Sequence, residues 1–196
     1  MLINNNIYHM VTNGSLSLII GPMFSGKSTK GLEILNRYES IGKSILTITH
    51  IIDKRYGIDV ISNHNLVQKK CISLEYLMSI VEKPEYINSE IVFIEESQFF
   101  NDLIEFVKKA VDTDCKNVIV IGLSGDFKRE KFGDILDLIP IADNVEKLSA
   151  YCKLCSDGTL AHFTQKKNND EKQTVVGSCD LYLPVCRYHY FNFNEK

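Results

Sequence analysis

The sequence lacks the features that mark a membrane protein or a secreted one. No apolar run approaches the roughly 18 residues that a membrane-spanning helix needs, and the N-terminal stretch MLINNNIYHM has no basic segment followed by an apolar one. The 6 cysteines include closely spaced ones, which is typical of metal ligation in a reducing compartment and not of a disulfide framework. We therefore expect a soluble, cytoplasmic protein without a membrane partner.

The sequence also lacks a concentration of positive charge. Lys and Arg number 22 against 25 Asp and Glu, so the net charge is −3, and no basic cluster stands out. A protein that grips nucleic acid needs such a cluster to neutralise phosphates, so the composition favours small molecules and no nucleic-acid partner. There is no internal repeat, and 196 residues with 44% hydrophobic composition suffice for one ordinary domain plus a small appendage.

Short apolar runs alternate with segments of helical periodicity. The predicted strands are Leu16–Ile20, Ile45–Thr49, Ile91–Glu95, Val118–Leu123 and Val145–Leu148, and the predicted helices are Ser28–Ile41, Leu74–Val81 and Leu103–Val111. Several of the strands are almost continuously apolar, which indicates burial on both faces. The fold class is therefore α/β, a parallel sheet flanked by helices. The pattern ends near Ser149, which predicts a core over residues 1–150 and a smaller part over 151–196.

The stretch GPMFSGKST follows the first predicted strand and opens the first predicted helix. It fits the phosphate-loop pattern G-x-x-x-x-G-K-[ST], in which backbone N–H groups and a lysine face a polyphosphate while a hydroxyl reaches Mg²⁺. A chance glycine-rich turn is the alternative, but the strand–loop–helix context favours ATP with Mg²⁺. The predicted nucleotide-binding residues are Gly21, Pro22, Met23, Phe24, Ser25, Gly26, Lys27 and Ser28.

A pair of carboxylates, Glu95 and Glu96, ends the predicted strand in IVFIEESQFF. At this strand end one carboxylate can serve the metal and the other can accept a proton from the attacking hydroxyl of a phosphoryl transfer. The alternative is two solvated carboxylates that cap the next helix.

Two short motifs, YCKLC and VCRYHY, place Cys152, Cys155, Cys186 and His189 at paired i, i+3 spacing. Two such turns can complete a tetrahedron around Zn²⁺, and four protein ligands make the site structural. The alternative is buried thiols beside a surface histidine. Between the motifs, Gln165–Lys172 reads as an exposed polar loop. The remaining thiols, Cys71, Cys115 and Cys179, are predicted to be core residues.

Taken in order, GPMFSGKST, IDKRY, EESQFF, LSGDFKREKFG and the two metal motifs closely resemble the type II thymidine kinases, the family of cellular thymidine kinase also found in large DNA viruses. The resemblance runs from about Ser15 to Tyr190. It implies a RecA-like P-loop core with a zinc-bearing lasso over 151–196 that encloses a nucleoside. It further implies ATP-dependent 5′-phosphorylation of thymidine, a homotetramer, inhibition by thymidine triphosphate, and a location in the host cytoplasm if the source is viral.

The resemblance also implies roles for single residues. Glu96 matches the catalytic base. Glu95 stands where the family usually has Asp and would serve Mg²⁺ with a side chain one methylene longer. Asp53 and Arg55 match an Asp-x-Arg pair near the phosphates, where the guanidinium would neutralise developing charge, although bare sequence suggests an exposed turn. Gln98 belongs with the nucleotide-binding residues.

The same resemblance implies a thymine pocket, although the Phe residues alone would suggest core. The residues matched to the ring are Met23, Phe99, Leu123, Phe127 and Phe132, with Lys128–Lys131 as a lid and Thr164 as a further candidate. A substrate loop would offer its backbone to the thymine edge and Tyr182 to the deoxyribose. Its residues are Gln173, Thr174, Val175, Val176 and Gly177.

Two other functions remain open from the residues. One is an ATP-gated nucleic-acid-binding module with a zinc ribbon, which would need a basic stripe where QKKNNDEK offers mixed charge. The other is a P-loop kinase for a different small acceptor.

Overall fold

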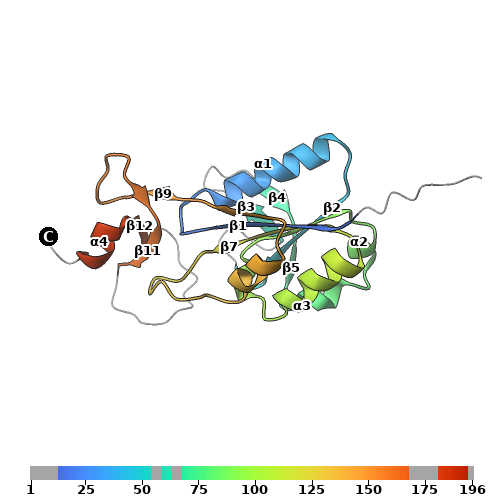
Figure 1. Cartoon of the computed structure of the whole chain (residues 1–196). Helices are drawn as coiled ribbons and strands as arrows, with labels where there is room; N and C mark the ends of the chain where they lie inside the picture. Colours follow the sequence, from blue (N-terminus) through green and yellow to red (C-terminus); the bar gives the residue numbers. More distant parts are fainter. Residues whose placement is uncertain (1–12, 54–58, 63–67, 168–180, 194–196) are drawn as a thin grey trace, which may run out of the picture.

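A six-stranded sheet forms the centre of the molecule in the computed structural model, which describes residues 13–53, 59–62, 68–167 and 181–193 (Figure 1). Every neighbouring pair in this sheet is parallel. The strands lie in the order β5 (Ile72–Leu74), β2 (Ile45–His50), β6 (Ile91–Ile94), β7 (Asn117–Leu123), β1 (Ser15–Gly21) and β8 (Asn144–Lys147). The predicted α/β class is confirmed.

Helices cover both faces of this sheet. Helix α1 (Lys27–Ser40) lies on one face, while α3 (Leu103–Lys108) and its π-helical continuation η3 (Lys109–Thr113) lie on the other (Figure 1). Side chains alternate along a strand, so Ile19 packs on the α1 side and Leu18 on the α3 side. Burial on both faces is why the strands are continuous apolar runs.

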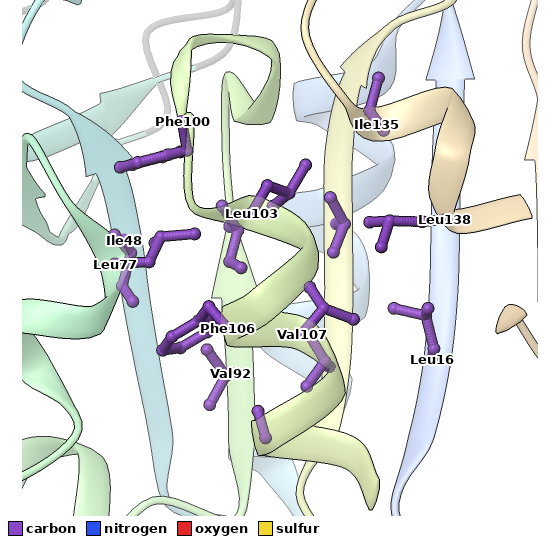
Figure 2. Close-up of a cluster of buried hydrophobic side chains, with 14 of the residues drawn as sticks. Leu16, Ile48, Leu77, Val92, Phe100, Leu103, Phe106, Val107, Ile135 and Leu138 are labelled. Carbon is purple, nitrogen blue, oxygen red and sulfur yellow. The ribbon is translucent and has the colours of Figure 1, made fainter.

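The larger hydrophobic cluster lies beneath α3. Figure 2 shows Leu103, Phe106 and Val107 of this helix directed at side chains of the sheet, among them Val92 and Leu16. The helical turns η1 (Leu77–Ile80) and η4 (Ile135–Ile141) close the sides of the cluster. Each fully buried side chain of this size contributes about 1.5–3 kcal/mol, so the cluster gives the strand ends a rigid base.

The prediction of a helix over Leu74–Val81 is wrong. Leu74 ends β5, only η1 is helical, in the 3₁₀ form, and α2 (Pro84–Ile87) follows separately. The predicted helix that begins at Leu103 changes to π geometry at Lys109. The other predicted strands and the first helix are found within one residue at each end. Among the described residues before Ser149, three short strands were missed, β5 and the antiparallel pair β3 (Val60–Ser62) and β4 (Gln68–Lys70); the short strands of the C-terminal part were also not predicted.

The C-terminal part lies beyond the carboxyl end of the sheet, at the left of Figure 1. Strand β9 (Ala150–Tyr151) pairs with β10 (Leu160–Ala161), β11 (Phe163–Lys166) pairs with β12 (Tyr182–Val185), and α4 (Arg187–Phe191) follows. A small cluster of its own, which includes Ala161, Val185 and Cys186, is buried here, and Phe24 of the glycine-rich loop packs against it.

Two predictions for polar and thiol residues need correction. The polar segment Gln165–Lys172 is not all exposed loop, because Gln165 and Lys166 belong to β11 and Lys166 is only 3% exposed. Cys71 is buried as predicted, but Cys115 is exposed; Cys179 lies outside the described residues. Within the described ranges, no helix has the length and apolarity that a membrane crossing requires.

Candidate functional site

The carboxyl ends of β1, β6 and β7 bring the predicted site residues to one edge of the sheet. The glycine-rich loop follows β1, the carboxylate pair follows β6, and residues 124–133 follow β7. Ligands of open parallel sheets bind at this edge, in crevices between the loops.

The loop after β1 is shaped by close approaches of its backbone. A Cβ on Gly21 would lie 2.6 Å from Ser25 Oγ and 2.8 Å from the Leu148 carbonyl oxygen, so only glycine fits. Gly26 has φ +83° and immediately precedes α1. Lys27 Nζ donates to the Pro22 carbonyl at 2.8 Å, which places the ammonium over the loop.

This loop fits a polyphosphate. Ser25 Oγ is buried and finds no hydrogen-bond partner among the described residues. The first N–H groups of α1, the Lys27 ammonium and the Ser25 hydroxyl are all donors, and they offer a phosphate both charge and hydrogen bonds.

Glu95 and Ser28 join the strand end to the start of α1. Ser28 Oγ donates to Glu95 Oε1 at 2.6 Å, and the carboxylate is only 5% exposed. The backbone of Glu95 still continues the sheet, with its N–H donating to the Ile48 carbonyl at 2.9 Å. A hydroxyl and a carboxylate beside a phosphate loop are the oxygen ligands that Mg²⁺ prefers, directly or through water, so the pair fits this ion.

Glu96 adopts a left-handed backbone conformation, with φ 52° and ψ 40°. Such a conformation costs a residue with a side chain on the order of 1–2 kcal/mol. Gln98 Nε2 donates to Glu96 Oε2 at 2.5 Å, while Gln98 Oε1 accepts from the Leu123 N–H at 3.2 Å. The amide therefore holds the Glu96 carboxylate at a fixed distance from β7.

Aromatic side chains gather at the same edge of the sheet. The rings of Phe99 and Phe132 meet edge to face at 5.4 Å, and the His50 ring lies 5.8 Å from Phe99. A cavity of about 490 Å³ opens beside Phe99, with walls from His50, Ile51, Ile52, Glu75, Tyr76 and Asn101. Burial lowers the pKa of His50, although the carboxylates of Glu75 and Asp102 raise it, so the ring facing this cavity is neutral at pH 7.

The C-terminal part contacts two of the site loops. Thr164, 4% exposed, accepts a hydrogen bond from the Met23 N–H at 3.0 Å. Lys166 Nζ lies 4.9 Å from the centre of the Phe127 ring, and Tyr182, 6% exposed, pairs with Lys166 across the β11–β12 ladder. Met23, Phe127 and Tyr182 are thus brought to the same region.

Sequence reasoning missed Lys166 because it lies in the polar stretch QKKNNDEK. The residues of β11 gave no signal, because the apolar Phe163 is less buried than the polar Thr164 and Lys166. Period-two alternation of apolar and polar residues, by which a half-buried strand is recognised, is therefore missing here.

The four predicted metal ligands lie together. Their sulfur and nitrogen atoms are within 4.8 Å of one another. Cys155 Sγ is 3.8 Å from Cys186 Sγ, and the three thiols lie 3.3–3.4 Å from His189 Nδ1. Tetrahedral Zn²⁺ with ordinary bond lengths places its sulfurs about 3.8 Å apart and sulfur and nitrogen about 3.6 Å apart, so the cluster fits Zn²⁺.

The thiols of this cluster differ in acidity. Burial raises the pKa of Cys152, but backbone N–H groups of Cys186, Cys155 and Leu154 outweigh it and lower the pKa to about 6. Burial and then the bond with Cys152 raise the pKa of Cys155 to about 11. The cluster therefore carries a thiolate at pH 7, which is the form that binds a metal.

Some predicted residues are not described. Arg55 and the substrate-loop residues lie outside the described ranges, the latter being Gln173, Thr174, Val175, Val176 and Gly177. Asp53, two residues before Arg55, lies three residues after the end of β2 and donates its N–H to the His50 carbonyl at 2.9 Å.

Comparison with known proteins gives a consistent result. A family model described as thymidine kinase matches residues 14–190. Similar proteins include "Thymidine kinase a" of Arabidopsis thaliana, 44% identical over 91% of this chain and 75% of the relative. The "Thymidine kinase" of Amsacta moorei entomopoxvirus is 41% identical over 91% and 98%, and the "Thymidine kinase, cytosolic" of Gallus gallus is 35% identical over 91% and 77%. The chain therefore belongs to the thymidine kinase family.

Proposed function

We propose that this protein transfers the γ-phosphate of ATP to the 5′-hydroxyl of thymidine, giving thymidine monophosphate and ADP. The observation that carries the proposal is the meeting, at one sheet edge, of a phosphate-binding loop and the held carboxylate of Glu96. Family membership supports thymidine as the acceptor, because the relatives are named thymidine kinases.

In the binding step, the loop from Gly21 to Ser28 cradles the β- and γ-phosphates, and the Lys27 ammonium neutralises them. Ser28 and Glu95 would hold Mg²⁺, which would supply positive charge to the phosphate oxygens. From the family resemblance we assign Asp53 and Arg55 to the same phosphates, where an always-charged guanidinium would offset charge that develops in the transition state.

In the chemical step, Glu96 accepts the proton of the 5′-hydroxyl as that oxygen forms its bond to the γ-phosphorus. The bond to the bridging β–γ oxygen breaks, and ADP leaves with that electron pair. Phosphoryl transfer depends mainly on position and charge. The bond from Gln98 therefore serves the reaction by holding the base in place.

The thymine ring lies among Met23, Phe99, Leu123, Phe127 and Phe132. The edge-to-face pair of Phe99 and Phe132 supports a flat, aromatic-lined slot. The backbone of Gln173–Gly177 reads the thymine edge, and Tyr182 contacts the deoxyribose.

Zinc is structural in this proposal, because four protein ligands leave no position open to substrate. It joins the two ends of the C-terminal excursion, which we assign to a lasso over 151–196 distinct from the ATP-binding core over 1–150. Its small buried cluster supports a staple of this kind. From the family we also infer a homotetramer, inhibition by thymidine triphosphate and a cytoplasmic location, since the chicken relative is named cytosolic.

Release of ADP from ATP tests the proposal with different acceptors. The purified protein is incubated with ATP, Mg²⁺ and, in turn, thymidine, other nucleosides and single-stranded DNA. We expect thymidine to give the fastest ADP release, matched mole for mole by thymidine monophosphate, and Lys27→Ala to abolish it. ADP release that responds to DNA, or to another acceptor and not to thymidine, would contradict the proposal.

A further inference from the structure

The loop after β7, residues 124–133, is built around one buried carboxylate. Asp126 is 6% exposed, and its Oδ1 accepts hydrogen bonds from the N–H groups of Lys128 and Glu130, both at 2.8 Å. The Asp126 N–H donates to the Glu130 carbonyl at 2.9 Å. Hydrogen bonds within residues 126–130 therefore hold the turn together, so we expect these residues to move as one unit.

Arg129 projects from this turn onto the C-terminal part. Its backbone is left-handed, with φ 65°. Its guanidinium carbon lies 4.5 Å from the ring centre of Tyr190, 4.7 Å from Phe191 and 5.6 Å from Phe163. We name these three rings the aromatic clamp. A guanidinium within about 6 Å of an aromatic face is attracted to it, and here three rings act on one group.

A hydrogen bond supports the same contact. The Tyr190 hydroxyl donates to the Phe127 carbonyl at 2.9 Å. Tyr190 and Phe191 follow the metal ligand His189 directly in α4, a helix of only 5 residues. A helix this short is not stable by itself. Its position therefore depends on packing and on the bond from His189 to the metal.

The other end of the loop reaches the catalytic carboxylate. Gly133 passes so close to Gln98 that a Cβ would lie 2.1 Å from the Gln98 carbonyl oxygen, and Gln98 in turn holds Glu96. Phe132 packs against Phe99 in the proposed thymine slot. The first residue of the loop contacts the phosphate loop, since the Ser124 N–H donates to the Gly21 carbonyl at 3.2 Å, whereas its far end contacts the nucleoside site.

We propose that Arg129 is a positioning residue through which the zinc-held helix α4 fixes the loop 124–133 and so sets the affinity for the nucleoside. The proposal rests on the thymidine kinase function proposed above. In this proposal the aromatic clamp connects the metal site to the loop that borders the substrate pocket.

Steady-state kinetics with three variants test the role in substrate binding. We expect Arg129→Ala to raise the KM for thymidine about five-fold, with little change in the KM for ATP, because only the contact to the clamp is lost. Arg129→Lys keeps the charge and restores part of the effect. Arg187→Ala is the matched control: its guanidinium also lies over a ring of the clamp, 4.9 Å from the centre of Phe163, but it does not join the clamp to the loop 124–133, so the thymidine KM should change much less than in Arg129→Ala.

Hydrogen exchange of the loop, followed by mass spectrometry, tests the connection to zinc without measuring activity. Removing zinc from the wild type with a chelator is expected to speed exchange in residues 124–133. In Arg129→Ala the loop already exchanges faster, and removing zinc adds little. A thymidine KM within about twofold of wild type, or loop exchange that zinc removal leaves unchanged, overturns the proposal. If the wild type does not phosphorylate thymidine, the proposed function fails. The exchange experiment alone then decides whether Arg129 connects the metal site to the loop.

Discussion

The two ends of the central sheet differ in whether their buried polar groups have hydrogen-bond partners within the protein. At the amino end, Lys116 Nζ donates to the Ser89 carbonyl at 2.6 Å and lies 4.5 Å from the Tyr86 ring centre. The Tyr86 hydroxyl donates to Asp114 at 2.5 Å, and Lys109 also pairs with Asp114. The protein itself satisfies these groups, and each satisfied bond of this kind contributes about 1 kcal/mol or more to stability.

At the carboxyl end, some groups are buried without such partners. The hydroxyls of Ser25 and Ser97 have no hydrogen-bond partner among the described residues. Phe24 and Glu96 are held at φ 64° and φ 52°. Left-handed backbone does not separate the two ends, because Cys115 at the amino end also has φ 53°. Unsatisfied buried donors do separate them; they cost stability and are found where a ligand is bound. The comparison indicates that the amino end serves stability and the carboxyl end serves chemistry.

Removing the base at the carboxyl end is expected to have the largest effect. Glu96→Gln keeps the size of the side chain but cannot accept a proton, so kcat for thymidine should fall by about 10²–10⁴-fold while both KM values change little. Steady-state kinetics with each substrate varied measure this. Near-normal turnover of the variant would show that Glu96 is not the base.

Loss of the metal site should have the next largest effect. The wild type is expected to hold one Zn²⁺ per chain. Cys186→Ala should lose this ion, raise the KM for thymidine and lower the unfolding temperature, while the core still binds ATP. His189→Cys should retain metal and activity, because thiolate is also a good zinc ligand. Elemental analysis of the purified variants decides first. A protein that is fully active without zinc would contradict the claim that the metal supports thymidine binding.

The metal-facing carboxylate should give an intermediate effect. Glu95→Ala removes the acceptor of the Ser28 hydroxyl and should raise the Mg²⁺ concentration for half-maximal rate by about ten-fold, the equivalent of one lost ligand contact of about 1.4 kcal/mol. Glu95→Asp should be tolerated. A Mg²⁺ titration of both variants tests the assignment, and an unchanged curve for the alanine variant contradicts it.

The smallest effect on activity is expected at the amino end. Tyr86→Phe keeps the ring that packs on Phe106 at 5.6 Å but loses the bond to Asp114, so the free energy of unfolding should fall by about 1–2 kcal/mol with kcat unchanged. Denaturant unfolding with thymidine assays measures both.

The pH dependence of this variant follows from Asp114. Burial raises the pKa of Asp114, but bonds from Tyr86 and Lys109 outweigh it, so the pKa is lowered below its ordinary 3.8. A lowered carboxyl pKa stabilises the fold above the unfolded value and loses that effect as pH falls through the folded value. The stability difference between wild type and Tyr86→Phe should therefore be full above about pH 5 and shrink at lower pH. A difference that grew in acid would contradict the assigned bond.

The sheet and the local motifs were predictable because they depend on periodicity and short spacing. The apolar strand β7 and the phosphate loop from Gly21 to Ser28 carry their signals within a few residues. The ligands Cys152 and Cys155 are equally local, and the second pair repeats their spacing.

Contacts between distant segments could not be read in this way. No local pattern pairs Met23 with Thr164, which only the family resemblance assigned to one pocket, or Arg129 with the rings of α4, since these contacts depend on where the C-terminal part packs. The left-handed conformation of Glu96 is likewise invisible, because residues other than glycine give no signal for it.

One paired measurement tests the division between the two ends most directly. Thymidine turnover and the free energy of unfolding are measured in parallel for wild type, Glu96→Gln and Tyr86→Phe. The account predicts opposite outcomes: Glu96→Gln loses turnover and keeps its stability, whereas Tyr86→Phe loses stability and keeps its turnover. Equal loss of turnover in both variants, or full turnover in Glu96→Gln, would contradict the claim that the carboxyl end holds the chemistry.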